Sequence, residues 1–387
     1  MIYLDNSATT KQYRQVTERM VEYMESAFGN PSSLYQLGVD SEKAIKKARK
    51  QLEEAMEMGE GTLYFTSGGT EADNMAIFGA VRALRKRGNR IVTSKVEHPA
   101  VLECCKRLEA EGFEVIYVDV DRQCRPDEKQ LKDAINDRTI LVSLMQVNNE
   151  TGTIMPLQRI KSMMEEKNAP GLFHCDAVQS FGKLPLPEKA DLVSVSGHKI
   201  HGPKGSGGLY VRKGVNLPPL MEGGGQERGM RSGTQNVPAI VGFGVAAALS
   251  QQDRAEAMSR ISSMRRYLMD GLRDSIRDVV INSPEEAGSD AGTCCGSLLN
   301  VSFAGTRGEV LLHTLEQDDI YVSTASACAS NKKGRSHVLR AMGLKDEEME
   351  GTLRFSLGRF NSPEEMDLVI DKVASAVKRF RRLGSFR

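Results

Sequence analysis

Apolar, strand-like runs alternate with amphipathic segments from about residue 60 to residue 212, and this alternation limits the possible folds more than any other feature of the chain. The strand-like runs, each with the helical pattern that follows it, lie at residues 90–93 and 100–111, 115–118 and 126–136, and 140–144 and 157–166. Strands joined through helices run parallel, and helices must then cover both faces of the sheet because such strands are buried. We therefore predict an α/β fold with a mostly parallel sheet.

Lys199 stands among small residues in the segment 196–205, directly after the apolar run 190–195. In α/β sheets, ligands gather at the carboxyl ends of such strands. Asp176 ends another apolar strand at 173–176, and pyridoxal 5'-phosphate enzymes need a lysine for the Schiff base and a carboxylate that keeps the pyridine nitrogen protonated. By itself the lysine motif leaves open the alternative of an exposed lysine in a Gly-rich turn.

A glycine turn supplies a candidate phosphate site. The β-branched and aromatic run 62–65 leads into Gly68, Gly69 and Thr70, after which apolar residues recur at helical spacing. Backbone N–H groups at the start of that helix, with the Thr70 hydroxyl, can cradle a phosphate. An ordinary tight turn would be the preferred interpretation without Asp176 and Lys199.

Composition excludes some classes of partner. With 52 basic and 51 acidic residues among 387, the net charge is +1, so no global field favours nucleic acid or a membrane surface, and no direct nucleic-acid binding is expected. No apolar span approaches the roughly 20 residues of a membrane helix. The N-terminus shows no signal-peptide pattern, which predicts a cytoplasmic protein.

The seven cysteines do not suggest a disulfide framework or a zinc site. Cys104–Cys105 and Cys294–Cys295 are adjacent pairs, which is poor geometry for disulfides, and no CxxC spacing occurs. Helical spacing predicts that Cys104 and Cys105 pack in the core, and Cys175 is expected inside the Asp176 strand.

The length allows two domains. We expect a large domain over residues 15–255, with residues 1–14 and 256–387 forming a small α+β domain. A final helix is predicted after Ser362, because Ser-Pro-Glu-Glu at 362–365 combines an N-cap, a proline at the first helical position and a capping-box glutamate.

Ten motifs in order resemble the cysteine desulfurases, which are pyridoxal phosphate enzymes of fold type I in the class V aminotransferase group, and the resemblance covers nearly the whole chain. The motifs are YLDNSATT at 3–10, GNPSS at 29–33, TSGGTE at 66–71, EHP at 97–99, VNNETG at 147–152, FHCDAVQS at 173–180, SGHKIHGPKG at 196–205, RSGT at 231–234, SAC at 326–328 and RFSLGR at 354–359. The resemblance implies a seven-stranded sheet between helices in the large domain.

The resemblance also implies roles around the cofactor. His98 would stack on the pyridine ring and handle protons, although a lone histidine in such a place is more often structural. Asn149 and Gln179 would lie beside the ring, with Gln179 reaching its phenolic oxygen. The phosphate ligands would be Ser196, His198, Thr70 with the Gly69 turn, and Thr234 from the second subunit of a homodimer.

Two further residues would act on the substrate. Arg354 lies in an apolar strand pattern and needs an anion, which the resemblance identifies as the substrate carboxylate; an Asp or Glu partner is the alternative. Cys328 lies in a small, polar segment with three cations nearby, which favours an exposed thiolate.

The implied reaction converts L-cysteine to L-alanine. Lys199 would bind the cofactor and remove the α-proton, and Cys328 would take the sulfur as a persulfide for an acceptor protein, either an iron–sulfur scaffold or a tRNA thiolation enzyme. A selenocysteine lyase, a class V aminotransferase of the same fold, and a non-enzymatic sulfur-relay or scaffold protein remain as alternatives.

Overall fold

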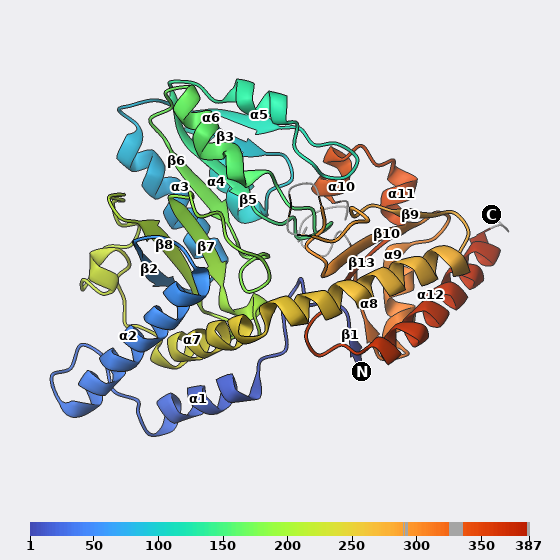
Figure 1. Cartoon of the computed structure of the whole chain (residues 1–387), viewed down its shortest axis with the longest axis horizontal. Coiled ribbons are helices and arrows are strands. Elements are labelled where there is room, and N and C mark those ends of the chain that lie inside the picture. The colour runs from blue at the N-terminus through green and yellow to red at the C-terminus, as the bar shows by residue number, and fades with distance from the viewer. Residues whose placement is uncertain (289, 291–292, 325–335, 385–387) are drawn as a thin grey trace.

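The computed structural model describes residues 1–288, 290, 293–324 and 336–384 (Figure 1). A seven-stranded sheet forms its larger part. Its strands lie in the order β2 (Gly61–Thr66), β8 (Gly207–Arg212), β7 (Leu192–Ser196), β6 (Leu172–Asp176), β5 (Thr139–Met145), β3 (Arg90–Ser94) and β4 (Glu114–Val118). β8 is antiparallel to both neighbours and the other pairs are parallel. The predicted mostly parallel sheet is confirmed.

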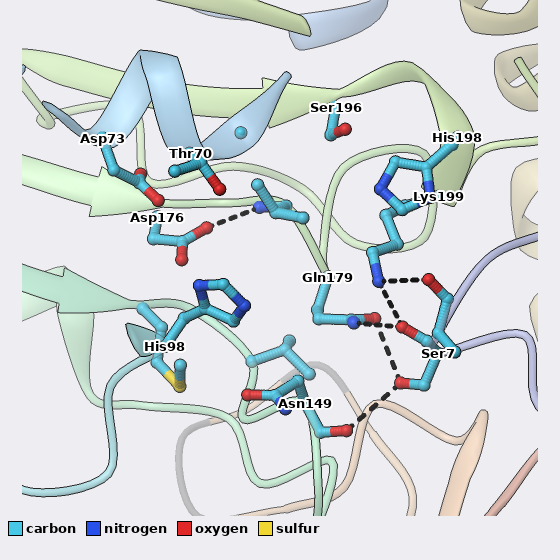
Figure 2. A pocket seen from close by; sticks show the side chains of 15 residues that line it. Ser7, Thr70, Asp73, His98, Asn149, Asp176, Gln179, Ser196, His198 and Lys199 are labelled. Carbon is cyan, nitrogen blue, oxygen red and sulfur yellow. Dashed lines mark hydrogen bonds between the residues drawn. The ribbon is translucent and has the colours of Figure 1, made fainter. Parts of the chain in front are cut away.

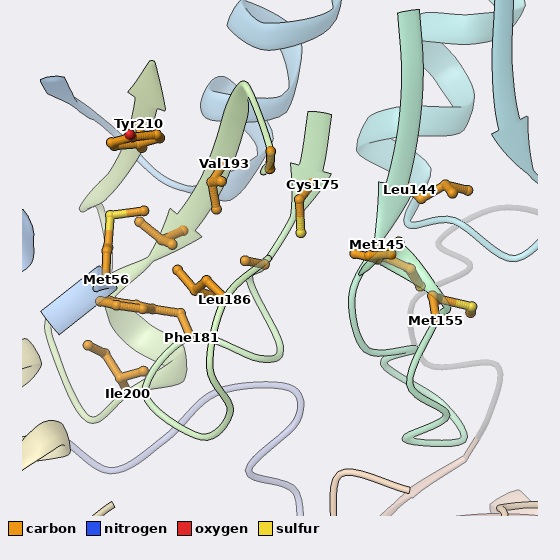
Figure 3. Close-up of a cluster of buried hydrophobic side chains, with 14 of the residues drawn as sticks. Met56, Leu144, Met145, Met155, Cys175, Phe181, Leu186, Val193, Ile200 and Tyr210 are labelled. Atoms are coloured by element: carbon orange, nitrogen blue, oxygen red, sulfur yellow. The ribbon is translucent and has the colours of Figure 1, made fainter. Parts of the chain in front are cut away.

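Helices cover both faces of this sheet. Leu141 and Val142, consecutive in β5, belong to different apolar clusters, because successive strand side chains point to opposite faces. One cluster includes side chains of α3 (Gly69–Leu84) and α4 (Pro99–Ala110). The other, part of which is shown in Figure 3, includes side chains of α1 (Arg14–Glu25), α2 (Gln36–Met56), α5 (Glu128–Ala134), α6 (Ile160–Glu166) and α7 (Val237–Gln252).

A second, antiparallel sheet has its own core. Its strands are β12 (Ser323–Thr324), β13 (Thr352–Ser356), β10 (Leu298–Phe303) and β9 (Val279–Ile281), in that order. A separate apolar cluster joins the sheet to α8 (Arg254–Ser275), α9 (Gly308–Glu316) and α12 (Pro363–Gly384). The chain begins in this part, because β1 (Ile2–Tyr3) pairs with β11 (Ile320–Tyr321). The predicted limits 15–255 for the large domain remain a proposal, which these separate cores support.

The shorter elements connect these layers. They are the 3₁₀ turns η1 (Leu157–Arg159), η2 (Gly197–Lys199) and η3 (Glu227–Gly229) and the helices α10 (His337–Ala341) and α11 (Asp346–Glu350). The final helix begins at Pro363 as predicted, and the Ser362 N–H donates to Glu365 Oε2 at 3.2 Å, which is one half of a capping box.

Local sequence also accounts for other details of the fold. Cys104, Cys105 and Cys175 are buried in the apolar clusters, as predicted. Two long helices follow each other almost directly, since Asp253 alone separates α7 from α8. Over the described part of the chain, no helix combines the length and the apolar character needed to cross a bilayer.

Candidate active site

A pocket of about 280 Å³ opens at the carboxyl edge of the large sheet (Figure 2). Four parallel strands and β2 end toward it, so that side chains from distant parts of the sequence meet there. The lining residues are Ser7, Ala8, Gly69, Thr70, Asp73, His98, Met145, Val147, Asn149, Asp176, Val178, Gln179, Ser196, His198 and Lys199.

The pocket brings together most residues singled out from the sequence. Nine of them, namely Gly69, Thr70, His98, Asn149, Asp176, Gln179, Ser196, His198 and Lys199, are in its lining. Thr234 and Arg354 are not among the lining residues. Cys328 lies outside the described residues.

Lys199 is held at the pocket by the N-terminal segment. It ends the turn η2 directly after β7, and its Nζ donates to the Ala8 carbonyl at 3.0 Å and to the Ser7 carbonyl. The sequence analysis assigned no role to Ser7, although it stands in the quoted motif at 3–10. Its hydroxyl lies 3.2 Å from the Asn149 carbonyl and 3.3 Å from Gln179 Oε1.

Two buried carboxyl groups, those of Asp176 and Asp73, line the pocket, and a third, that of Glu97, lies nearby in the sequence next to His98. Asp176 is 5% exposed, its Oδ1 accepts from the Val178 N–H at 2.9 Å, and burial raises its pKa to about 6. Burial also raises the pKa of Asp73 well above its ordinary value and that of the adjacent Glu97 to about 8. The ion pairs of the described residues include no Lys or Arg with any of these three groups.

Asp73 was missed by the sequence analysis. Its Oδ1 is one of six buried side-chain polar atoms without a partner among the described residues. His174 Nε2 lies 3.6 Å away, but burial lowers the pKa of His174 to about 3 and leaves the imidazole neutral. The sequence does contain a signal for Asp73. Its carboxylate stands between Ala72 and Met75, on the apolar face of the helical pattern that forms α3, where a charged residue is unusual.

His98 presents a neutral ring to the pocket. It caps α4, and its Nδ1 accepts from the Ala100 N–H at 3.1 Å. Burial, together with the charges of Lys199 and His337, lowers its pKa to about 4. Because Nδ1 is an acceptor, the proton of the neutral ring is on Nε2, which can donate into the pocket.

The N-terminus of α3, which also lines the pocket, is suited to a phosphate. It has no side-chain cap, so its N–H groups are available to an anion. The Ser196 hydroxyl is buried without a partner among the described residues, and Thr70 and His198 lie in the same lining. A Cβ on Gly69 would lie 2.6 Å from Val178 Cγ2, so a larger residue would obstruct this turn.

Arg354 pairs with an acidic side chain, which is one of the two alternatives that the sequence allowed. This β13 residue is 2% exposed; its Nη2 lies 2.8 Å from Asp5 Oδ1, and its Nη1 donates to the Asn149 carbonyl at 2.9 Å. Its Nε is buried without a partner. Arg354 therefore lies next to the pocket, behind Asn149, and keeps one unused donor.

The residues present fit pyridoxal 5'-phosphate. A protonated pyridine nitrogen would add a cation beside the buried Asp176 carboxylate, whose pKa burial raises although the charge of Lys199 opposes that effect. A phosphate would supply an acceptor for the Ser196 hydroxyl, which has no partner among the described residues. Lys199 would supply the amine for the aldehyde.

Comparison with known proteins agrees with this geometry. The chain matches the Aminotransferase class-V family over residues 2–369. It is 44% identical over 386 residues to the cysteine desulfurase IscS of Methanosarcina thermophila, covering 99% of this chain and 93% of that protein. It is 42% identical to the putative cysteine desulfurase IscS 1 of Bacillus subtilis, covering 98% and 99% of the two chains.

Solved structures show the same architecture. A NifS-like protein superposes with a TM-score of 0.90 at 37% identity, covering 97% of this chain and 99% of the other. SspA in complex with cysteine superposes with a TM-score of 0.79 at 32% identity, covering 94% and 100%. The chain therefore belongs to the class V aminotransferase family and, within it, to the pyridoxal phosphate-dependent cysteine desulfurases.

Replacing Asp176 by Asn should stabilise the cofactor-free protein near neutral pH. Because folding raises the pKa of Asp176 from 3.8 to about 6, its contribution is favourable below about pH 4 and is lost as the pH rises through 6. Urea unfolding should show the variant about 1–3 kcal/mol more stable than the native protein at pH 7.5 and equal to it at pH 4.

Asp133→Asn, at an exposed carboxylate in α5, is the matched control and should show no such pH-dependent gain. Saturating pyridoxal phosphate should stabilise the native protein more than Asp176→Asn. Equal stabilities of native protein and Asp176→Asn at both pH values would contradict an uncompensated carboxylate.

Proposed function

We propose that this protein removes sulfur from L-cysteine, releases L-alanine and passes the sulfur, carried as a persulfide on Cys328, to an acceptor protein. The observation that carries the proposal is the convergence of Lys199 and the buried Asp176 in one pocket with a helix N-terminus suited to phosphate. Family membership identifies the reaction class, and the roles of individual residues are inferred from their contacts.

When bound, pyridoxal phosphate supplies an aldehyde for amines and an electron-poor ring that stabilises negative charge at the substrate Cα. Lys199 Nζ would bind that aldehyde, and its amine is the base that would take the substrate α-proton. Asp176 would hold the ring nitrogen and favour its protonated form. His98 Nε2–H can deliver a proton, because the Ala100 N–H fixes the ring with Nε2 free.

The sulfur step belongs to Cys328, whose position lies outside the described residues. Its thiolate attacks the substrate sulfur, so that a new S–S bond forms as the Cβ–S bond breaks. Protons delivered to Cβ and Cα complete alanine, and the sulfur remains on Cys328 as a persulfide. The three cations at 332, 333 and 335 support thiolate formation.

Arg354 is proposed to bind the substrate carboxylate. Its unused Nε and its contact with the Asn149 carbonyl support this role, because Asn149 lines the pocket. The Asp5 carboxylate compensates the buried guanidinium until a substrate carboxylate approaches.

A homodimer is proposed, with Thr234 reaching the phosphate of the second subunit. Thr234 is exposed, and the ion pair of Arg231 with Glu71 at 2.8 Å fixes its segment beside the turn at Thr70. Exposed apolar side chains between α1 and α2, including Phe28 and Leu34, also suit an interface between copies.

The acceptor is proposed to be an iron–sulfur scaffold or a tRNA thiolation enzyme. The six described cysteines are free thiols, which supports the predicted cytoplasmic location, since disulfides are rare in that compartment. A sulfur-relay protein without cofactor is disfavoured because Asp176 and Lys199 line the same pocket.

Lys199→Ala should abolish the visible absorbance of the bound cofactor and reduce alanine formation by at least about 10²–10⁴-fold, because Lys199 is the only lysine among the described residues that line the pocket. Spectra and alanine assays of the purified protein measure both. Lys204→Ala, at an exposed lysine of the same loop, should retain both. Cofactor absorbance and alanine release in Lys199→Ala would show that the assignment of Lys199 is wrong.

Cys328→Ser should retain cofactor and still change its spectrum when cysteine is added, because cofactor and substrate binding depend on Lys199 and Arg354. Alanine formation in the presence of a thiol reductant should fall at least about 100-fold. Native rates of alanine release by this variant would remove the persulfide mechanism and favour the selenocysteine lyase alternative.

A further inference from the structure

A second lysine, Lys183, lies beside the pocket, and the proposed mechanism does not use it. It is partly buried in the segment that follows β6, and its Nζ donates to Gln179 Oε1 at 3.5 Å. Gln179 Nε2 donates in turn to the Ser7 carbonyl at 2.9 Å. Lys183 is therefore one contact away from a side chain that lines the pocket.

This contact and the bond from Gln179 Nε2 to the Ser7 carbonyl favour the same orientation of the Gln179 amide. An ammonium group has only donors, so it requires the amide oxygen rather than the amide nitrogen to face it. The Ser7 hydroxyl lies near Gln179 Oε1 and the Asn149 carbonyl, but its single proton can serve only one of them. Lys183 is the donor that can face Oε1 permanently, which leaves the second Nε2 proton for the pocket.

The surroundings of Lys183 act on its charge in both directions. A cavity of about 30 Å³, large enough for a water molecule, separates Lys183 from Lys199 and is also lined by His201 and Arg359. Burial lowers the pKa of Lys183, and the Cys295 thiol opposes that effect. His201 is neutral, because burial lowers its pKa to about 4.

The pKa of the Cys295 thiol is also shifted. A hydrogen bond from Cys294 and the charge of Lys183 together lower the pKa of Cys295 to about 6. Both cysteines are buried, and the charge on Cys295 in turn opposes the lowering of the Lys183 pKa.

We propose that Lys183 is a positioning residue: by holding Gln179 Oε1 it turns Gln179 Nε2 toward the phenolic oxygen of the bound cofactor. This inference rests on the proposed function of the pocket. A donor at that oxygen stabilises its ionised form and thereby lowers the pH at which the cofactor absorbance changes. Removing Lys183 should let the amide rotate and raise that pH.

The experiment is a spectroscopic pH titration of the cofactor-loaded protein, which does not depend on turnover. Lys183→Met should raise the midpoint of the absorbance change by about one pH unit, and Lys183→Arg should restore it. Gln179→Leu should give the same shift, and the double variant should show no more than either single variant. Lys183→Gln replaces Lys183→Met if the latter does not fold.

Lys189→Met, at an exposed lysine in the same segment, is the matched control and should keep the native midpoint. A native midpoint in folded, cofactor-loaded Lys183→Met would overturn the inference. Shifts of Lys183→Met and Gln179→Leu that add in the double variant would also overturn it, because Lys183 would then act independently of Gln179. Stoichiometric cofactor binding in each variant keeps this failure distinct from a failure of the proposed function.

Discussion

Hydrogen bonds from residues 5–10 join the two sheets at the pocket, and the geometry of the site depends on them. Asn6 Nδ2 donates to the Ser356 carbonyl of β13 at 2.9 Å, and the Thr10 N–H donates to the His198 carbonyl at 3.0 Å. The same segment accepts from Lys199 and pairs with Arg354 through Asp5. A shift of this segment would therefore move the groups proposed to bind cofactor and substrate together.

The pocket retains polar groups that a stable core would have satisfied. Asp73 Oδ1 and Ser196 Oγ are buried without partners among the described residues, and Asp176 has a single backbone donor in the hydrogen bonds described above. Each such group costs free energy in the cofactor-free protein. A ligand with a cationic ring nitrogen and an anionic phosphate would pair with these groups and remove their free-energy cost. Such unsatisfied groups are expected at a binding site, where function is maintained at some expense of stability.

The large sheet was predictable because its strands carry local signals: apolar runs, helical periodicity and the caps between them. β8 was less evident, since Gly207 and Gly208 begin it and its antiparallel pairing depends on β2 and β7. Lys199, Asp176 and the turn at Gly69 were predictable from patterns at strand ends, whereas the roles of the other candidate residues came from the family resemblance. Asp5, Ser7 and Lys183 could not be found from strand-end patterns. Asp5 and Ser7 act through contacts between segments about 170–350 residues apart, and Lys183 contacts a side chain four residues before it in a segment of turns.

The electrostatics of the pocket combine two opposite preferences. Burial raises the pKa values of Asp73 and Asp176, which line the pocket, and of the neighbouring Glu97, so protons or a cation are favoured beside these carboxyl groups. The uncapped N-terminus of α3 belongs to the same lining, and its dipole favours anions. A ligand that carries both a basic ring nitrogen and a phosphate would satisfy both preferences. We therefore expect charge to contribute to the orientation of such a ligand before any covalent bond to Lys199 forms.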